Sequence, residues 1–244
     1  AEAAIWDGTE DTSWYYREHD VIVSENGERI AIFNIRTAEE LAGLAKLVRN
    51  GNSMKNTMIN LVSDVTLNDT TNFDNWDEQP PANNWTAIGA VPIEAPNVNV
   101  VMTIQPECRN TVFAGMFNGN GHTISGMYSL HHNYAGLFAR TSGIITNVIV
   151  KDSYIQCINT QKVESGDTAL WEACAGGITA ICDRGVISHC EFDGKIFASG
   201  LNQVGYGTHG SFAGGIVGKF SDDENGVAAV VMMFALVPAG FLIN

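Results

Sequence analysis

The fold of this chain is indicated by a segment that occurs twice in outline: AGLFARTSGIITNVIVKDSYI at residues 135–155 and GGITAICDRGVISHCEFDGKI at residues 176–196. Each copy is about 21 residues long and contains three short stretches of alternating apolar residues, separated by Gly, Asn or Asp. Alternation with a period of two is typical of half-buried strands, and small polar residues favour turns. The segment therefore predicts three strands and three corners.

The block that opens this unit, a small residue followed by Gly and an apolar residue, occurs four times. Its copies lie at 114–117, 135–138, 176–179 and 214–217. Self-similarity at a fixed period predicts stacked units in which each strand pairs with its equivalent about 4.8 Å away. The later copies are spaced more widely because of insertions at 156–175 and 197–213. We therefore expect an all-β solenoid from which two insertions leave as loops.

The segment before the repeats predicts a hairpin and a further strand. Strands at 21–25 and 28–33 flank Asn26-Gly27, a dipeptide typical of two-residue hairpin turns. Residues 58–67 alternate as a strand, and residues 68–84 form a polar loop rich in Asp, Asn and Pro.

An amphipathic helix is predicted over residues 38–49. Thr37 is placed to accept a hydrogen bond from the Glu40 amide and so to cap the helix. We expect this helix to close the first coil. The chain then divides into 1–57 (hairpin and helical cap), 58–112 (first strands and polar loop) and 113–244 (coils), all in one domain spanning 1–244.

Composition and charge exclude several classes of protein. The chain of 244 residues has a net charge of −14, only 16% charged residues and 25 glycines, which argues against a helical bundle. A net negative field repels phosphates, so we expect no nucleic-acid partner. The five cysteines form no CxxC pair and leave one over, which favours buried thiols.

The C-terminal run at residues 227–243 carries no charged side chain. It is shorter than the ~20 apolar residues that span a bilayer, so strands of a last coil followed by an apolar tail are favoured over a membrane anchor. An apolar terminal coil without a cover also predicts end-to-end self-association.

Segments across nearly the whole chain resemble the GLUG-repeat proteins of bacteria. The matching segments include WDGT at 6–9, TAEELAGLA at 37–45, WTAIG at 85–89 and, most specifically, FAGMFNGNGHTISG at 113–126. The resemblance implies a right-handed parallel β-helix, a secreted or cell-surface location and a role in adhesion, and it implies no catalytic residues. The sequence departs from the family pattern where Asn118 replaces the usual Asp and where the last repeat becomes apolar after Gly226.

Three patterns that resemble cofactor or metal sites are interpreted as structural. Residues 205–210 spell GxGxxG, but no helix is predicted after them, as a dinucleotide site requires. Cys182, His189 and Cys190 should point in different directions, because Cys190 takes an inward position and His189 a corner. Residues 222–225 lack the ligand spacing of an EF-hand loop. We therefore predict no cofactor, no metal and no catalytic residue.

The insertions carry the residues that we select as a candidate ligand-binding site: Trp171, Tyr206 and His209. Aromatic rings offer flat apolar faces to sugars or proteins, although Trp171 alone could simply anchor its own loop. The leading hypothesis is a secreted or cell-surface adhesion and recognition module that binds a host or bacterial surface glycan or protein. One alternative is a polysaccharide lyase or glycoside hydrolase, which needs two carboxylates at a defined separation. The other is a passive structural spacer.

Overall fold

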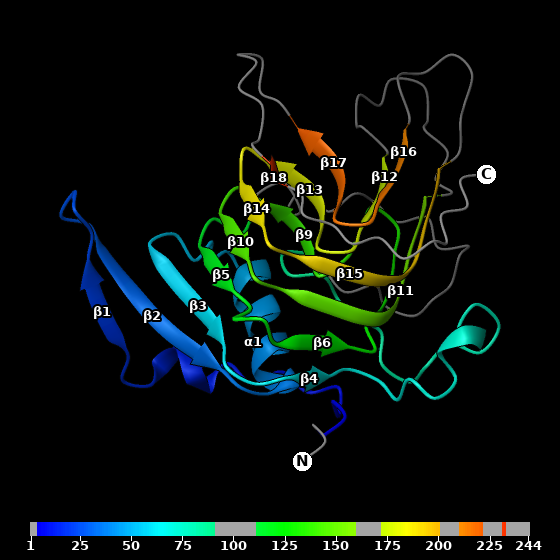
Figure 1. Cartoon of the computed structure of the whole chain (residues 1–244), viewed down its shortest axis with the longest axis horizontal. Coiled ribbons are helices and arrows are strands. Elements are labelled where there is room, and N and C mark those ends of the chain that lie inside the picture. Colours follow the sequence, from blue (N-terminus) through cyan, green and yellow to red (C-terminus); the bar gives the residue numbers. More distant parts are fainter. Residues whose placement is uncertain (1–3, 91–110, 160–171, 201–209, 222–230, 233–244) are drawn as a thin grey trace.

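The computed structural model describes residues 4–90, 111–159, 172–200, 210–221 and 231–232. Within these residues the chain forms four β-sheets and one α-helix, and the helix is buried against the strands (Figure 1). One large hydrophobic cluster joins apolar side chains of the helix with those of the sheets. The architecture is therefore mixed α/β.

The largest sheet has seven strands, in the order β1-β2-β3-β5-β10-β14-β18. Its strands are β1 (Asp20–Val23), β2 (Arg29–Ile35), β3 (Thr57–Leu61), β5 (Met116–Asn118), β10 (Ile144–Thr146), β14 (Val186–Ser188) and β18 (Val231–Met232). β1 and β2 are antiparallel, whereas every other neighbouring pair is parallel.

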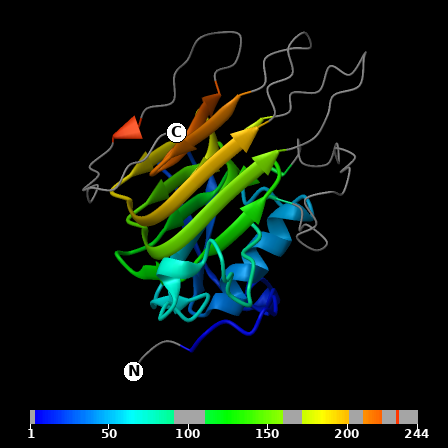
Figure 2. The ribbon, with the colours of Figure 1, turned by 90° about the vertical axis from the view of Figure 1, so that its right-hand side faces the viewer.

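Three smaller sheets contain only parallel pairs. The first comprises β15 (Glu191–Gly200), β11 (Ile149–Asn159), β6 (Thr123–Ser125) and β4 (Val65–Thr66), with β7 (Tyr128–His131) also paired to β11. The second comprises β16 (Ser211–Gly214), β12 (Ala173–Gly176) and β8 (Tyr134–Ala135). The third comprises β17 (Val217–Ser221), β13 (Thr179–Asp183) and β9 (Phe138–Thr141). Figure 2 shows the long strands β11 and β15 side by side.

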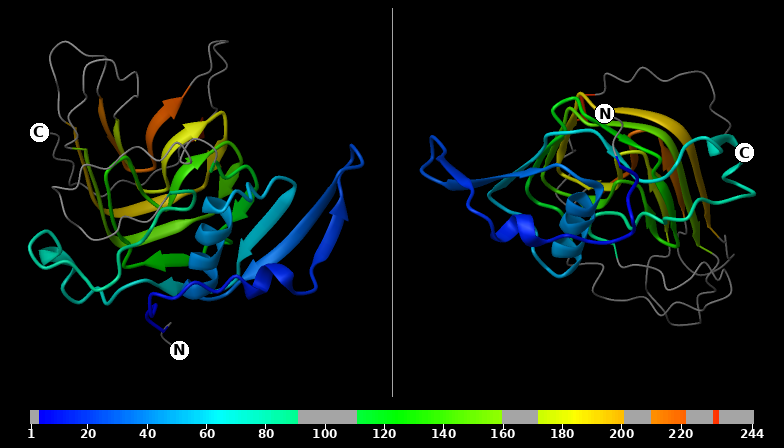
Figure 3. Two further views of the ribbon diagram at one scale, coloured as in Figure 1. Left: turned by 180° about the vertical axis from the view of Figure 1, so that it is seen from behind. Right: turned by 90° about the horizontal axis from the view of Figure 1, so that it is seen from below.

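The expected all-β right-handed parallel β-helix is wrong. The described strands do not form a single parallel solenoid, because they divide among four sheets, of which the largest is mixed and curled (Figure 3). The chain departs from the expected fold because its N-terminal part lacks the repeat. There a hairpin reverses the chain and adds an antiparallel pair to the sheet, and an amphipathic helix buries its apolar face in the shared core.

The predicted helix is confirmed as α1 (Ala38–Arg49). The Thr37 hydroxyl accepts a hydrogen bond from the Glu40 backbone N–H at 3.2 Å, as the capping motif requires. The helix buries Leu41, Leu44 and Val48 completely in the large cluster. The spacing of these apolar residues in the sequence therefore identified the buried face correctly.

The predicted hairpin is confirmed, but its turn differs. Ser24 donates its backbone N–H to the Glu28 carbonyl, and the Gly27 N–H returns to the Ser24 carbonyl, both at 2.9 Å. Gly27 has a φ of 80°, so the connection is a three-residue loop whose last residue is left-handed. The expected two-residue turn at Asn26-Gly27 is therefore wrong by one residue.

Within this architecture, the repeat predicted correctly how its two complete copies pair. Ile145 lies opposite Ile187, and Thr146 lies opposite Ser188. Glycine recurs at the corner before these strands because neighbouring backbones approach closely there. A Cβ added at Gly143 would lie 1.9 Å from the Gly115 carbonyl oxygen, which no side chain tolerates.

The outermost copies of the repeat were aligned incorrectly. Met116 and Phe117 pair with Ile144 and Ile145 of β10. Residues 114–117 are therefore not equivalent to residues 135–138. The bridge partner of Phe138 on that side is Ile88. At the other end, the spacing from Gly185 and Gly226 predicts that Val231 is equivalent to Cys190, but Val231 pairs with Ile187, three positions earlier. Similar short blocks therefore occupy different strands.

The remaining N-terminal segments are shorter than expected. The strand predicted over residues 58–67 is divided into β3 and β4. The polar loop contains the 3₁₀ turn η2 (Phe73–Asn75), and a second turn, η1 (Ser13–Tyr16), precedes the hairpin. No helix among the described residues is long and apolar enough to cross a membrane. Apart from β18, the C-terminal run lies outside the described residues.

Candidate binding face on the seven-stranded sheet

Two parallel rows of side chains cross the outer surface of the seven-stranded sheet. The apolar row consists of Ile32, Met58, Met116, Ile144 and Val186. The polar row consists of Asn34, Asn60, Asn118, Thr146 and Ser188. Each row takes one residue from each of the five strands β2, β3, β5, β10 and β14, at matched registers. We call these ten residues the two-row face.

Strand alternation places the two-row face outside. Successive side chains of a strand point to opposite faces, and the residues between the two rows are buried. These inner residues are Phe33, Ile59, Phe117, Ile145 and Ile187, all at most 6% exposed. In contrast, Ile144 is 37% and Val186 41% exposed. The two rows are therefore uncharged and face solvent, whereas the row between them is apolar and faces the core.

Hydrogen bonds between neighbouring strands orient the polar row. The Asn60 amide donates to the Asn34 side-chain oxygen at 3.3 Å, and the Ser188 hydroxyl donates to Thr146 at 3.1 Å. The Asn118 side-chain oxygen accepts from the Asn147 amide at 3.1 Å. Because these contacts fix the side chains relative to the sheet, the row needs little ordering when a ligand binds.

The geometry of the two rows suits an extended ligand that lies across the strands. Neighbouring strands are about 4.8 Å apart, so both rows repeat at this spacing. One row offers amides and hydroxyls, which donate and accept hydrogen bonds, and the other offers methyl and thioether groups. A ligand with one polar edge and one apolar face in each repeat would match both rows.

A carboxylate lies just beyond the C-terminal ends of β3 and β5. Asp64 accepts hydrogen bonds from the Thr123 backbone N–H at 2.9 Å and, at 3.1 Å, from His122. The Thr123 hydrogen bond lowers the pKa of the Asp64 carboxyl, and His122 adds to this effect. A general acid of a glycoside hydrolase instead needs a raised pKa.

Hydrogen bonds also lower the pKa values of three other carboxyl groups. Hydrogen bonds from Thr9, Ser13 and Thr71 lower the pKa values of the carboxyl groups of Asp7, Asp11 and Asp69, respectively. None of these four carboxyl groups therefore fits the acid role of the enzymatic alternative.

The residues selected from the sequence, Trp171, Tyr206 and His209, lie outside the described residues. The neighbour of Trp171 in the chain, Glu172, is described. Its carboxylate accepts two hydrogen bonds from the Lys219 ammonium, both at 2.6 Å. Lys219 also lies 5.0 Å from the ring centroid of Phe212, a cation–π contact. The C-terminal end of the first insertion is thus fastened to β17.

A second ion pair lies on the same group of strands. The Arg140 guanidinium on β9 contacts the Asp183 carboxylate on β13 at 2.6 Å, and both side chains are less than one quarter exposed. In each of the two ion pairs the charges are neutralised by the partner side chain. We therefore assign both ion pairs a structural role between neighbouring segments.

The candidate metal ligands of the sequence do not converge. Cys182 and Cys190 are buried, whereas His189 is exposed. His189 has a φ of 53° and its equivalent Asn147 a φ of 54°, which confirms the predicted corner position. The described residues contain no group of three or more potential metal ligands. Of the other two patterns, 205–210 and 222–225, all residues except Gly210 lie outside the described residues.

Burial accounts for the chemistry of the described thiols. Loss of water around the sulfur raises the pKa of Cys190 to about 11 and that of Cys174 to about 12. A thiol that stays protonated is a weak nucleophile and a weak metal ligand. These two cysteines therefore act as small core residues, in agreement with the expectation of buried thiols.

A cluster of aromatic rings is another candidate for a surface where a sugar would meet flat apolar faces. Tyr128 and Tyr154 stack with ring centroids 5.6 Å apart, and Trp76 packs edge-on against Tyr128. All three side chains are at most 8% exposed, because the polar loop that carries Trp76 covers the tyrosines. The cluster anchors this loop and presents little ring surface to a ligand.

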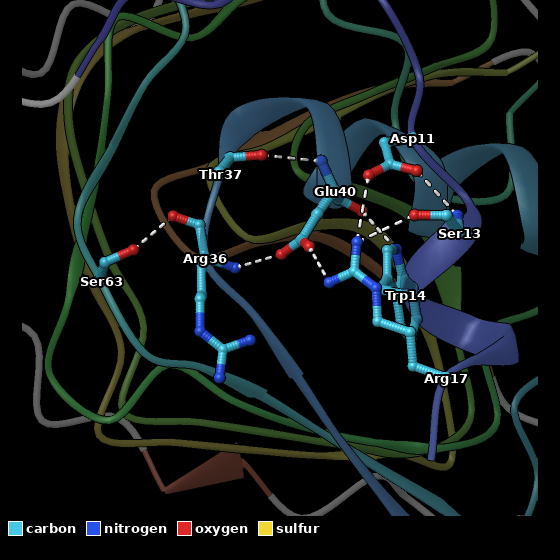
Figure 4. Close-up of polar contacts among 8 residues, drawn as sticks. All are labelled: Asp11, Ser13, Trp14, Arg17, Arg36, Thr37, Glu40 and Ser63. Carbon is cyan, nitrogen blue, oxygen red and sulfur yellow. Dashed lines mark hydrogen bonds and ion pairs between the residues drawn. The ribbon is translucent and has the colours of Figure 1, made fainter. Parts of the chain in front are cut away.

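A buried carboxylate near the start of α1, that of Glu40, bonds to two other segments of the chain (Figure 4). Glu40 accepts from the Arg36 backbone N–H at 2.7 Å and from the Arg17 guanidinium at 3.0 Å. The Trp14 indole donates to the Glu40 carbonyl at 3.0 Å. These bonds fasten the segment before β1 to the helix, so we assign the cluster a structural role.

Comparisons with protein-family models, with curated proteins and with solved structures found no match. The resemblance to GLUG-repeat proteins therefore stays an expectation from the sequence.

Sequence reasoning missed the two-row face. The repeats contain part of the signal, because Ile144 and Thr146 recur as Val186 and Ser188 at the same spacing. The contribution of the nonrepetitive strands β2 and β3 depends on their register, which only the structure provides.

Proposed function

We propose that this protein is a secreted or cell-surface recognition module that binds a linear neutral glycan across the two-row face. The observation that supports this proposal is the matched register of an apolar row and a polar row over five neighbouring strands. The proposed binding site therefore lies on the surface of the sheet and not on the insertions that the sequence suggested.

The chemistry of sugars corresponds to the two rows. A pyranose ring has a face of C–H groups and a rim of hydroxyls, and in an extended chain these features repeat once per sugar. The length of one sugar unit is close to the strand spacing of about 4.8 Å. Successive sugars would therefore meet equivalent side chains, with C–H faces on the apolar row and hydroxyls on Asn34, Asn60 and Asn118.

Charge favours a neutral ligand. All ten side chains of the two-row face are uncharged, and the chain carries a net charge of −14. Uronic acids, sulfated sugars and nucleic acids would approach a negative field without a cationic side chain on this face to offset it. We therefore expect neutral glucans, xylans or mannans to bind better than their acidic counterparts.

Binding is tested by calorimetry with neutral oligosaccharides of increasing length. We expect affinity to rise until the ligand covers about five strands, at about 4.8 Å per strand, and then to level off. Removal of one hydrogen-bonding side chain in Asn60→Ala should weaken binding roughly fivefold, the equivalent of about 1 kcal/mol. Lys151→Ala on β11, which lies outside this sheet, is the matched control and should bind like the wild type.

Four results would contradict the proposal. Equal affinity for short and long ligands would indicate an end-binding pocket, and unchanged affinity of Asn60→Ala and Met116→Ala would place binding elsewhere. Turnover of any tested glycan would favour the carbohydrate-active enzyme, and binding to none of them would favour the passive spacer.

A further inference from the structure

The seven-stranded sheet ends in an unprotected strand. β1 pairs only with β2 among the described residues and forms one end of the sheet order. The hairpin that contains β1 projects from the body of the molecule (Figure 1). Edge strands of soluble proteins are usually blunted by charges, proline or a bulge, because their backbone groups can pair with another chain.

Hydrogen bonds at the hairpin show which backbone groups face outward. In an antiparallel pair, hydrogen-bonded and non-hydrogen-bonded residues alternate. Ser24 donates to the Glu28 carbonyl at 2.9 Å, so Ile22 is also hydrogen bonded to β2, whereas Val21 and Val23 are not. The partner of Val21 across the pair confirms this alternation. Ala31 lies opposite Val21, and its N–H points away from β1 and donates to the Asn56 carbonyl, just before β3.

The side chains of this edge are apolar and exposed. Val21 is 40%, Ile22 44% and Val23 64% exposed. Strand alternation places Ile22 on one face and both valines on the other, so an added strand would find apolar neighbours on both faces. β-Branched residues also keep the edge extended, which lowers the entropy lost on pairing.

We propose that the β1 edge binds an extended segment of another protein as an eighth strand, and that the segment carries basic residues beside its apolar ones. The charge around the edge supports this choice of partner. Glu18, Asp20, Glu25 and Glu28 are all exposed, and Arg29 is the one basic residue of the hairpin. Lysine or arginine beside the pairing residues would complement these four carboxylates.

The same charges disfavour a second copy of this chain as the occupant. In a symmetric dimer, the β1 edges would pair with each other and would bring both sets of four carboxylates together. Each partner would also contribute a net charge of −14. Like charges across an interface oppose association. This inference does not depend on the proposed glycan site, which uses the outer face of the sheet.

The test uses a short synthetic peptide of alternating valine and threonine with lysine at both ends. Binding to the whole chain is measured by fluorescence anisotropy. We expect the lysine peptide to bind at least about fivefold more tightly than the same peptide with terminal glutamates, and the difference to shrink at high salt. Methylation of every backbone nitrogen of the peptide should abolish binding, because it removes the N–H groups from both edges of the added strand.

Two protein variants locate the site. Val21→Pro removes an outward N–H and leaves the hydrogen bonds between Ile22 and β2 in place, so binding should fall at least about fivefold. Val21→Thr keeps the shape and the N–H and is the matched control. Because the methylated peptide is tested on the wild-type protein, the result does not depend on the folding of a variant.

Equal binding of methylated and unmethylated peptides would overturn the proposal, as would equal binding of the lysine and glutamate peptides. Wild-type chain that sediments as a dimer, and as a monomer after Val21→Pro, would overturn it in favour of self-association.

Discussion

The two faces of the seven-stranded sheet have opposite properties, although they belong to the same strands. On the inner face, Phe117, Ile145 and Ile187 are at most 1% exposed and pack in the large hydrophobic cluster. On the outer face, their chain neighbours Met116, Ile144 and Val186 are partly or largely exposed. Neighbouring residues of one strand thus have different roles: one packs in the core, and the next faces solvent and is accessible to a ligand.

Similar residues recur from strand to strand on both faces of the sheet, but for different reasons. The inner row must be apolar because it shares a core with α1, and any polar group there would lose its water. The outer row has no such requirement, yet it also repeats in type from strand to strand. We therefore expect substitutions on the inner face to change stability, and substitutions on the outer face to change binding.

The largest effect is expected at Phe117. Phe117→Ala should lower the free energy of unfolding by about 3–5 kcal/mol, because it removes a fully buried ring that contacts Phe138 and leaves a cavity. Urea denaturation followed by circular dichroism measures the change. Met116→Ala is the matched outer-face variant and should cost less than about 1 kcal/mol. Equal losses for both variants would show that the two faces do not differ.

The second effect is a loss of stability at alkaline pH. Burial raises the pKa of Cys190 from 9.0 to about 11, so in the unfolded chain this thiol loses its proton at a lower pH than in the folded chain. Its contribution is fully present below pH 9 and is lost as the pH rises from 9 through 11; at pH 10 the loss is about 1 kcal/mol.

Cys190→Val isolates this contribution, because valine occupies the equivalent position at residue 148. The urea midpoint of the variant should fall less steeply between pH 8 and 10 than that of the wild type. Parallel slopes for the two proteins would mean that burial does not raise the pKa of Cys190 above that of the unfolded chain.

A comparable effect is expected at the start of α1, which packs against the inner face. Thr37→Ala removes the oxygen that accepts the Glu40 N–H and should cost about 1 kcal/mol. Thr37→Ser keeps this oxygen and should recover most of the loss. Thermal unfolding of the three proteins provides the comparison, and a serine variant as unstable as the alanine variant would argue against a capping role.

The smallest effect is expected on the outer face. Asn60→Ala removes one contact between side chains in the polar row and should change the free energy of unfolding by less than about 0.5 kcal/mol. A loss above about 2 kcal/mol would indicate that the polar row stabilises the sheet, and the assignment of the outer face to binding would need revision.

Local structure was largely predictable from the sequence. Thr37, Glu40 and the apolar spacing that follows identified α1, and Asn26-Gly27 identified the hairpin, because these signals depend on neighbouring residues. The pairing of residues 144–146 with 186–188 was also predictable, because both copies of the repeat carry the same alternation.

The candidate site was not predictable in the same way. Selection of Trp171, Tyr206 and His209 used residue type, which gives no information on what lies beside a side chain. The two-row face depends instead on the registers of β2, β3 and β5. The strands β2 and β3 lie outside the repeat, and β5 lies in a copy that pairs differently from the expected alignment.

The sequence alone determined where the helix begins, that a hairpin contains Asn26-Gly27 and which residues of each repeated strand are buried, because these properties depend on contacts within a few residues. Tertiary structure decided that the nonrepetitive N-terminal strands extend the same sheet, that the sheet is mixed, and that α1 shares its core. The physical reason is that apolar surface can be buried against any partner of suitable shape, so periodicity specifies that a face is buried but not what covers it.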